Sequence, residues 1–439
     1  MSFARMISNT FDSWIAAQAK YSAAAMEKAI SATYLVRRRE TFGQVVMPTK
    51  GSVLASPVIA DWDPEPDYFF HWLRDSAIVM RGVAELMEDA ADEAERARWR
   101  RHFVDFVNFS LRLSALDGTS AYDARPTTWR GFRKFLRPRS EIAAVSGDKL
   151  LGEPRFNPDG TIDIFRWSRP QFDGPALRAL ACLRYLAVGG PPSEELARLL
   201  RLDLSFTLHH AGKRCIGPWE EAGQIAHHYY VALVQLGALV HGRSWGGAAE
   251  ADWDAAERSL RATLDCHWSE KQRIYLARLP AAETTGDMLD AAVLLAVWDA
   301  DLPDGPHSVH DPRVHETKAA IEDFFAREFP INRGRPAGPM FGRYRGDRYF
   351  GGGAWYPTTL AAAGLYYRRA QGAGVDGDAL IACGDAMMNA VRSVTPADGA
   401  LSEQVDRATG MQTSARHLTW SYAAFAAAAR ARAQVMKAI

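Results

Sequence analysis

The links between the helical segments of this chain alternate between short and long, and this alternation constrains the fold more than any single motif. Apolar residues recur with helical periodicity along the whole sequence, and no persuasive run of alternating residues indicates a strand. We expect about twelve helices. They are predicted near residues 10–30, 74–92, 94–114, 172–187, 192–207, 221–241, 248–264, 284–300, 312–328, 356–371, 377–394 and 412–431.

Short links such as 189–192 and 242–244 are followed by long ones. Helices joined by short links form hairpins, and hairpins arranged in a ring bring the long loops to one end. The pattern therefore predicts an all-α fold, an (α/α)6 barrel of about twelve helices with its active site at the loop-rich mouth. No Ser/Thr-rich or Pro-rich tether divides the chain, so residues 1–439 are predicted to form a single domain.

Charge and hydropathy argue against several classes of protein. The formal net charge is +0, so no field steers the chain towards nucleic acid or an anionic membrane. No apolar run is long enough to cross a bilayer, and Met1–Ile30 reads as an amphipathic helix rather than a signal peptide. Four widely spaced cysteines form no metal or redox pattern. We expect reduced thiols and a cytoplasmic protein, a monomer or simple homo-oligomer, with export by a less obvious route as the alternative.

Glu220 is the first candidate for a catalytic acid. It lies between Trp219 and Glu221, just after a Gly217-Pro218 turn. An apolar wall disfavours the charged form of a carboxyl group, and a neighbouring carboxylate adds to the effect. A carboxyl that keeps its proton can donate it to a departing oxygen. From these residues alone, the alternative is a surface helix start, where the helix dipole favours Glu.

The other long loops carry residues suited to binding sugar. Arg74 beside Asp75 can donate to some hydroxyls and accept from others, although an N-cap Asp with a surface Arg is the alternative. Tryptophan offers a platform for the apolar face of a sugar. The further candidates are Tyr68, Trp72, Trp167, Arg169, Arg343, Trp355, Glu403 and Gln404. Taken alone, Glu403 also fits a solvated loop residue. Asp173 and Gly174 are expected only to shape the start of the next helix.

The histidines do not indicate a metal site. His209-His210, His227-His228 and the 307–310 segment have no cysteine or carboxylate at a spacing typical of zinc. No glycine-rich phosphate loop follows a strand. We therefore expect no metal and no cofactor.

These motifs, in this order, resemble the glucoamylase family of glycoside hydrolases over nearly the whole chain. The matching segments are 53–57, 66–76, 152–157, 169–179, 219–221, 342–344, Trp355, 399–406, 414–416 and 418–424. The resemblance implies an (α/α)6 barrel and an inverting, exo-acting hydrolase that releases β-glucose from the non-reducing ends of short α-glucans. It also implies that Glu220 is the general acid and Glu403 the general base.

The resemblance assigns the substrate contacts as well. Arg74, Asp75, Trp219, Glu221 and Arg343 would bind the terminal glucose and its neighbour, Tyr68 and Trp167 would line the site, and Gln404 would help to place the water. In an inverting enzyme the two carboxyl groups stand about 6.5–9.5 Å apart, with room for that water. Glu221 adjoins Glu220 in the sequence and is therefore expected to be a ligand rather than the base.

The chain departs from the family pattern beside the acid. Gly217-Pro218 stands where glucoamylases usually carry Asp-Leu, and Ala222-Gly223-Gln224 replaces Val-Asn-Gly. These positions are expected near the leaving sugar, so an α-1,6-specific isomaltose-type hydrolase and a trehalase remain rivals. A non-catalytic glucan-binding or regulatory module is a rival of another class. No separate starch-binding module is expected, which favours soluble oligosaccharides.

Overall fold

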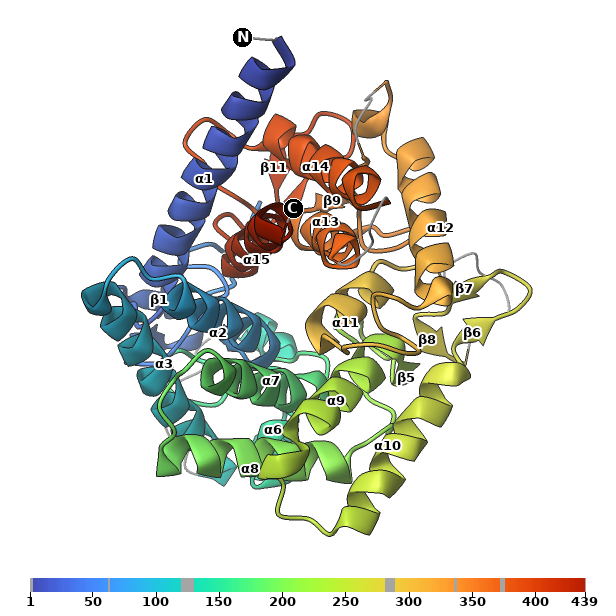
Figure 1. The fold of residues 1–439 in the computed structure, drawn as a ribbon. Coiled ribbons are helices and arrows are strands. Elements are labelled where there is room, and N and C mark those ends of the chain that lie inside the picture. The colour runs from blue at the N-terminus through green and yellow to red at the C-terminus, as the bar shows by residue number, and fades with distance from the viewer. Residues whose placement is uncertain are drawn as a thin grey trace. The chain divides into compact units, whose positions relative to one another are not determined.

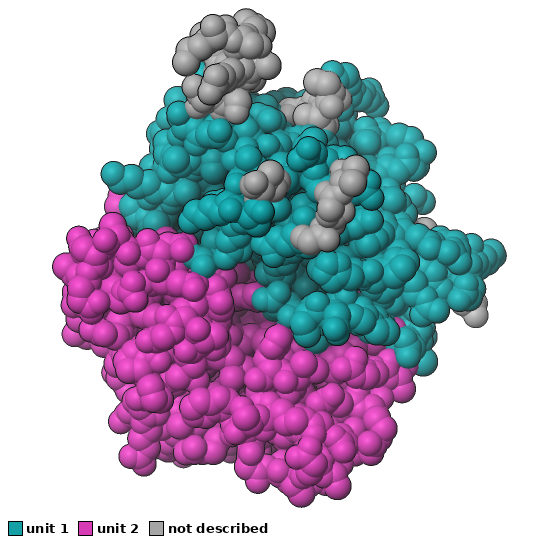
Figure 2. All heavy atoms as spheres, in the orientation of Figure 1, with its two compact units in different colours: residues 1–27, 62–66, 265–439 teal, residues 28–61, 67–264 magenta. Residues whose placement is uncertain are grey.

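The computed structural model describes residues 3–61, 64–119, 130–280, 289–334, 338–371 and 376–438. These residues form two compact units, which Figure 2 shows in different colours. Unit 1 comprises residues 1–27, 62–66 and 265–439, and unit 2 comprises residues 28–61 and 67–264. Figure 1 gives the order of the elements along the chain.

Unit 2 is mostly helical. Its helices are α2 (Leu73–Glu88), α3 (Glu93–Ser114), α5 (Arg139–Ala143), α6 (Asp148–Leu151), α7 (Asp173–Ala187), α8 (Glu194–His209), α9 (Tyr229–Gly242) and α10 (Glu250–Asp265). Its strands are β1 (Arg37–Arg39), β2 (Gln44–Val46), β3 (His71–Trp72), β4 (Arg155–Phe156) and β5 (His227–His228). The antiparallel pair of β3 and β4 places Trp72 opposite Arg155.

Unit 1 has the same character. Its helices are α1 (Phe3–Ala29), α11 (Ala292–Ala300), α12 (Pro312–Glu328), α13 (Tyr356–Ala370), α14 (Gly377–Val394) and α15 (Thr419–Ala438). Its strands are β6 (Trp268–Ser269), β7 (Ile274–Tyr275), β8 (Arg278–Leu279), β9 (Ala354–Trp355), β10 (Gln404–Val405) and β11 (Gln412–Thr413). The last three form a small sheet in the order β11-β10-β9.

Enclosed and half-exposed helices alternate along the sequence. Every residue of α9 from Tyr229 to Leu239 is buried, whereas α10 buries only Trp253, Leu260 and Leu264. A helix that is apolar on all faces must be enclosed by other elements, and a helix with one apolar stripe faces solvent. The helices α2, α7, α9, α11, α13 and α15 are largely buried, whereas α3, α8, α10, α12 and α14 each expose one face. This alternation of inner and outer helices agrees with the predicted all-α hairpins.

Close helix packing within each unit depends on small residues. In unit 2, α7 packs against α2 and α9; in unit 1, α13 packs against α11, α14 and α15. A Cβ added to Gly174 at the start of α7 would lie 2.6 Å from the Leu73 side chain. A Cβ added to Gly364 in α13 would lie 2.4 Å from the ring of Trp298. Side chains at either glycine would separate these helices.

The predicted helix boundaries agree with the structure to within two residues for most helices. Two predictions differ by more, because α1 begins at Phe3 rather than at residue 10 and α2 ends at Glu88 rather than at residue 92. The remaining exceptions adjoin loops. The range 221–241 is wrong at its start because α9 begins only at Tyr229. The preceding residues form turns and a β-bridge between Cys215 and Ala226. The range 412–431 is also wrong at its start, because Gln412–Thr413 pair with β10 and α15 begins at Thr419.

Part of one predicted helix lies outside the described residues. The range 284–300 begins among residues 281–288, which are not described, and α11 covers Ala292–Ala300. None of the described helices combines the length and the apolar character that a membrane span requires.

Candidate functional site

Three N–H donors in unit 2 converge on the carboxylate of Glu220. Trp72 Nε1 donates to both carboxylate oxygens, at 3.0 and 3.2 Å, and Arg74 Nη2 donates to Oε1 at 2.8 Å. Trp167 Nε1 donates to Oε2. The carboxylate is therefore fixed in position, and both of its oxygens already accept hydrogen bonds.

Glu220 has an unusual backbone conformation in a tight turn. Its φ is 59°, and its N–H donates to the carbonyl of Gly217 at 3.1 Å. A non-glycine residue in the left-handed region costs about 1–3 kcal/mol and persists only when its surroundings hold it there. The three donors to its side chain and the turn that begins at Gly217 are such surroundings.

Arg74, at the start of α2, connects three carboxylates. Its Nη1 donates to Asp173 Oδ2 at 3.2 Å, and its Nε lies 3.5 Å from Asp75 Oδ2, in addition to the bond to Glu220. Burial lowers the pKa of Arg74, but the carboxylates of Glu220, Asp173 and Asp75 outweigh it and raise that pKa above the usual value. The guanidinium therefore stays charged and holds the acidic group together.

Asp75 is a buried carboxyl with one acceptor atom to spare. Burial raises the pKa of Asp75 to about 6; Arg74 opposes this shift, whereas Glu220 and Asp173 add to it. Its Oδ2 accepts no hydrogen bond from the residues that the structure describes. A buried acceptor without a donor is costly, and a sugar hydroxyl could satisfy it.

Aromatic rings stand beside this group. The Tyr68 and Trp72 ring centroids lie 5.1 Å apart, and those of Trp72 and Trp167 lie 6.0 Å apart. Trp219 and Glu221, on either side of Glu220, are half-buried. The structure thus brings together most of the residues of unit 2 that the sequence predicted for the site.

Arg169 is engaged with protein groups. It donates to Glu153 Oε2 at 2.6 Å, to Asp163 Oδ2 at 3.2 Å and to the carbonyl of Trp167 at 2.9 Å. Substrate contact would compete with these bonds. The observed contacts show that Arg169 supports the loop that carries Trp167, and its contact with substrate stays a prediction.

Glu403 lies in unit 1 and is 3% exposed. Ser414 Oγ donates to its Oε2, and its backbone N–H donates to the carbonyl of Ala415 at 2.8 Å. The next residue, Gln404, belongs to β10, where Trp355 and Thr413 are its neighbours across the small sheet. Glu403 is therefore a buried carboxyl on a rigid support, not the solvated loop residue that its sequence context also allowed.

Gln404 presents a donor beside Glu403. Its Oε1 accepts the N–H of Gly353 at 3.1 Å, which fixes the orientation of the amide. Its Nε2 donates to no group among the described residues. A Cβ at Gly353 would lie 2.4 Å from the carbonyl oxygen of Val405, so this close approach requires glycine. The amide can thus offer an N–H to a water or a hydroxyl.

Arg343 is the second arginine that the sequence predicted for the site. It is buried, donates to both oxygens of Asp347 at 2.7 and 2.5 Å, and lies 5.4 Å from the ring centroid of Trp355. Burial lowers the pKa of Arg343, but Asp347 outweighs burial and raises it, and Glu403 adds to the rise. A permanent positive charge therefore lies within electrostatic range of Glu403.

Sequence reasoning missed several supporting residues. Asp173, which was expected only to shape the start of α7, forms a buried ion pair with Arg74. Asp347 and Ser414 hold Arg343 and Glu403, respectively. Asp347 follows Arg343 by four residues, a spacing that could have indicated a pair, and Ser414 lies in the matching segment 414–416, to which no role was given. Asp173 is 99 residues from Arg74, so no local pattern links the two.

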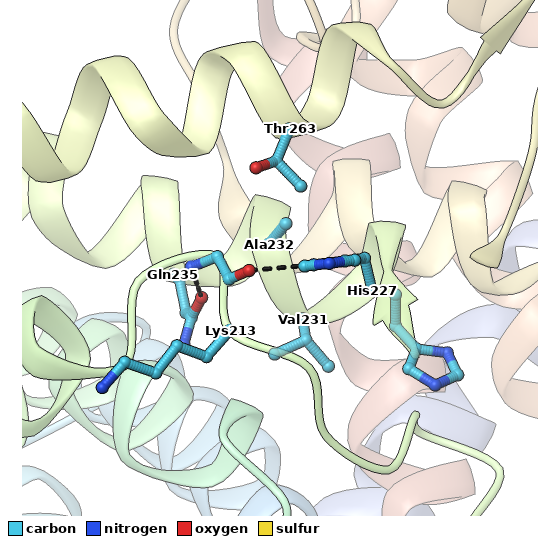
Figure 3. Close-up of a pocket in the computed structure, with 8 residues that line it drawn as sticks. Lys213, His227, Val231, Ala232, Gln235 and Thr263 are labelled. Atoms are coloured by element: carbon cyan, nitrogen blue, oxygen red, sulfur yellow. Dashed lines mark hydrogen bonds between the residues drawn. The ribbon is translucent and has the colours of Figure 1, made fainter. Parts of the chain in front are cut away.

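The histidines contribute to two further features of unit 2. The ligand atoms of Asp148, His209 and His210 lie within 4.8 Å of one another, a grouping that the sequence did not predict because Asp148 is distant in the chain. A small pocket, shown in Figure 3, lies beside His227 and Gln235. Their side chains there bond to the backbone of residues 210 and 212, and no space remains for a sugar.

Comparison with known proteins gives a consistent answer. Residues 30–112, 140–382 and 375–430 match the family described as glycosyl hydrolases family 15. The chain is 25% identical to a glucoamylase of Blastobotrys adeninivorans, over 90% of this chain and 69% of the relative. It is 26% identical to a sporulation-specific intracellular glucoamylase of Saccharomyces cerevisiae, over 89% of this chain and 80% of the relative.

Solved structures show the same fold. The glucoamylase of Hormoconis resinae matches with a TM-score of 0.77 at 24% identity, over 97% of this chain and 74% of that one. The glucoamylase of Saccharomycopsis fibuligera matches with a TM-score of 0.76 at 22% identity, over 97% and 96% of the two chains. These matches confirm the predicted fold class, the (α/α)6 barrel of glucoamylases.

Proposed function

The chain belongs to glycosyl hydrolase family 15 and is a glycoside hydrolase, and we propose that it is an inverting, exo-acting α-glucosidase. It would release β-glucose from the non-reducing ends of short α-glucans. The single observation that carries the proposal is the fixed carboxylate of Glu220, with Trp72, Arg74 and Trp167 all donating to it.

Glu220 is proposed as the general acid. Its proton passes to the glycosidic oxygen as the bond to the anomeric carbon breaks, so negative charge develops on its carboxylate in the transition state. Donors that are already aimed at that carboxylate stabilise this charge without reorganising. Arg74 and the two indoles are such donors.

Glu403 is proposed as the general base. It would take a proton from water as the water attacks the anomeric carbon on the opposite face of the ring. Ser414 holds one of its oxygens, and the spare N–H of Gln404 can orient the water. The mechanism requires a separation of about 6.5–9.5 Å between the Glu220 and Glu403 carboxyl groups, which an experimental structure with bound sugar would measure.

The remaining candidates are proposed to bind the terminal sugar. The spare oxygen of Asp75 would accept a hydroxyl. The fixed guanidinium groups of Arg74 and Arg343 and the carboxylate of Glu221 would contact other hydroxyls. Tyr68, Trp72, Trp167, Trp219 and Trp355 would provide apolar walls for the ring.

One structural feature beside Glu220 favours a second candidate for the linkage that the enzyme cleaves. A Cβ at Gly217 would lie 2.3 Å from His228 Nδ1, so the imidazole takes the place of a side chain beside the acid. This is the position at which glucoamylases usually carry Asp. An α-1,6-specific hydrolase of isomaltose-type sugars is therefore the second candidate, and trehalose is a third substrate.

Some proposals follow from composition and chemistry. The acid–base mechanism uses only carboxyl groups and water, so we expect no cofactor. Cys182 and Cys215 are buried free thiols, which agrees with a reducing cytoplasm, and one relative is named as intracellular. We further propose that residues 1–439 act as a single catalytic domain.

Hydrolysis of maltose, isomaltose and trehalose, followed by NMR of the first sugar released, tests the proposal. We expect β-glucose from maltose or isomaltose. The α anomer as the first product would contradict inversion, and cleavage of trehalose alone would contradict the oligosaccharide assignment.

Two variants test whether the site is catalytic rather than a binding module. Glu220→Gln and Glu403→Gln should each lower kcat by about 10²–10⁴-fold, as expected for loss of general acid–base catalysis. Glu194→Gln, at the exposed start of α8, is the matched control and should leave kcat unchanged. Wild-type rates in either site variant would reject the assignment.

A further inference from the structure

A buried arginine lies against both tryptophans that donate to Glu220. The guanidinium carbon of Arg155 is 3.8 Å from the ring centroid of Trp167 and 4.8 Å from that of Trp72. It is also 4.1 Å from the ring centroid of Phe70. Arg155 is 1% exposed, so three aromatic rings and the surrounding protein shield it from solvent.

The backbone of β3 and the carboxylate of Asp163 hold Arg155 in place. Its backbone pairs with that of Trp72 across the β3–β4 pair, and its Nε donates to Asp163 Oδ2 at 2.9 Å. Arg169 also donates to Asp163, and the N–H of Phe165 donates to its other oxygen at 2.9 Å. Burial raises the pKa of Asp163, but Arg155 and Arg169 outweigh burial and lower it. Asp163 is therefore a charged anchor for the guanidinium.

Burying the Arg155 guanidinium costs free energy, so filling space alone does not explain an arginine at this position. Arg155 Nη1 is buried and donates to no group among the described residues. A buried cation with an unmade hydrogen bond is expensive, and an apolar side chain of similar volume would fill the same space at lower cost. The rings in contact with Arg155 suggest what compensates: a cation is attracted to the faces of aromatic rings and orients them.

We propose that Arg155 is a positioning residue for the general acid: its guanidinium fixes the planes of Trp72 and Trp167 so that both indole N–H groups point at Glu220. This inference rests on the proposed role of Glu220. Arg155 itself contacts the indole rings and acts through them. Trp167 lies in a loop between β4 and α7, outside any described helix or strand, so its ring has most need of such a support.

The test compares Arg155→Met and Arg155→Lys with the wild type on the best disaccharide substrate. Met keeps volume without charge, and Lys keeps charge without the planar surface. We expect Arg155→Met to lower kcat about 10- to 100-fold while KM changes less than threefold, because the lost interactions act in the transition state. Arg155→Lys should fall between Arg155→Met and the wild type.

The pH–rate profile separates positioning from general stability. The charged groups around Glu220, namely Arg74, Asp75 and Asp173, are the same in every variant. If the indole N–H groups no longer point at Glu220 in Arg155→Met, hydrogen bonds that favour the charged form of the general acid are lost, so the alkaline limb of its profile should move to higher pH. The limb of Arg155→Lys should lie between that of Arg155→Met and that of the wild type.

Arg368→Met is the matched control. Arg368 lies 3.6 Å from the ring centroid of Trp298, donates to the Trp298 carbonyl and pairs with Asp301, and neither of these residues is proposed for the site. It should leave kcat and the pH profile unchanged. Equal kcat for Arg155→Met and the wild type, or a fall in thermal stability with no change in kcat or pH profile, would overturn the inference.

Two further outcomes are distinguishable. If Arg155→Met does not fold, Arg155→Lys carries the test: wild-type kcat together with unchanged tryptophan fluorescence would overturn the inference. If Glu220→Gln keeps wild-type activity, the proposed acid is wrong whatever the Arg155 variants show.

Discussion

Replacing Trp167 with Phe removes one of the three donors to Glu220 and leaves an aromatic wall in place. The lost hydrogen bond is the one from the indole Nε1 to Oε2, while the bonds from Trp72 and Arg74 remain. A hydrogen bond to a charged group contributes about 1.5–3 kcal/mol. Since 1.36 kcal/mol corresponds to a tenfold change in rate, kcat should fall about 10- to 150-fold.

The loss should appear in kcat because negative charge develops on Glu220 only as its proton leaves. The assay is steady-state hydrolysis of the best disaccharide substrate, with kcat and KM determined separately. Trp253→Phe is the matched control, since the indole of Trp253 donates to the carbonyl of Leu239 at 3.1 Å in the unit 2 core. That variant should lose some stability and keep its kcat.

Two results would refute this reasoning. A Trp167→Phe enzyme with kcat within twofold of the wild type would mean that the indole donor does not stabilise the transition state. A raised KM with unchanged kcat would mean that Trp167 binds the sugar equally in the ground and transition states.

Three further substitutions test the fold and the acidic group. The guanidinium of Arg178 donates to the buried Asp203 carboxylate at 2.7 and 2.8 Å, so Asp203→Ala leaves a buried charge without its partner. The free energy of unfolding in urea should fall by about 3–5 kcal/mol, and a loss below about 1 kcal/mol would argue against the pair. Gly217→Ala should lower the free energy of unfolding by about 1–3 kcal/mol, because the new Cβ meets His228. Adding His228→Ala should restore most of that stability, and additive losses in the double variant would contradict the contact. Burial raises the pKa of Asp75 to about 6, so the folded state binds its proton more tightly than the unfolded state and stability falls as pH rises from about 4 to 6. The unfolding free energy of the wild type relative to Asp75→Asn should therefore drop by about 3 kcal/mol between pH 4 and pH 7, and a constant difference would contradict the buried carboxyl.

Most helices could be predicted from the sequence because their apolar residues recur with local helical periodicity. The range 312–328 matches α12, and 94–114 differs from α3 by one residue at its start. Both helices have one apolar stripe and a capping Asp, which are local signals. Periodicity failed before Tyr229 and Thr419 because turns and short-range backbone pairing replace the helix there. Cys215 bridges Ala226, and β11 pairs with β10.

The candidate site could be predicted only in part. Glu220, Arg74 and Trp167 were found from residue type, loop position and family resemblance, and the structure brings all three into contact. Asp173 and Arg155 were not found, because their importance arises from an ion pair with Arg74 and from stacking on Trp72, in segments far apart in sequence. Supporting residues of this kind have ordinary sequence contexts.

The most direct test of the central claim compares Glu220→Gln and Glu403→Gln on a disaccharide and on α-glucosyl fluoride. Fluoride departs with little help from a proton, so loss of a general acid should matter far less on this substrate, whereas loss of the base should slow both reactions. We predict that Glu220→Gln loses at least about 100-fold more activity on the disaccharide than on the fluoride, and that Glu403→Gln loses activity on both. Equal losses on the two substrates for Glu220→Gln would contradict its role as the acid.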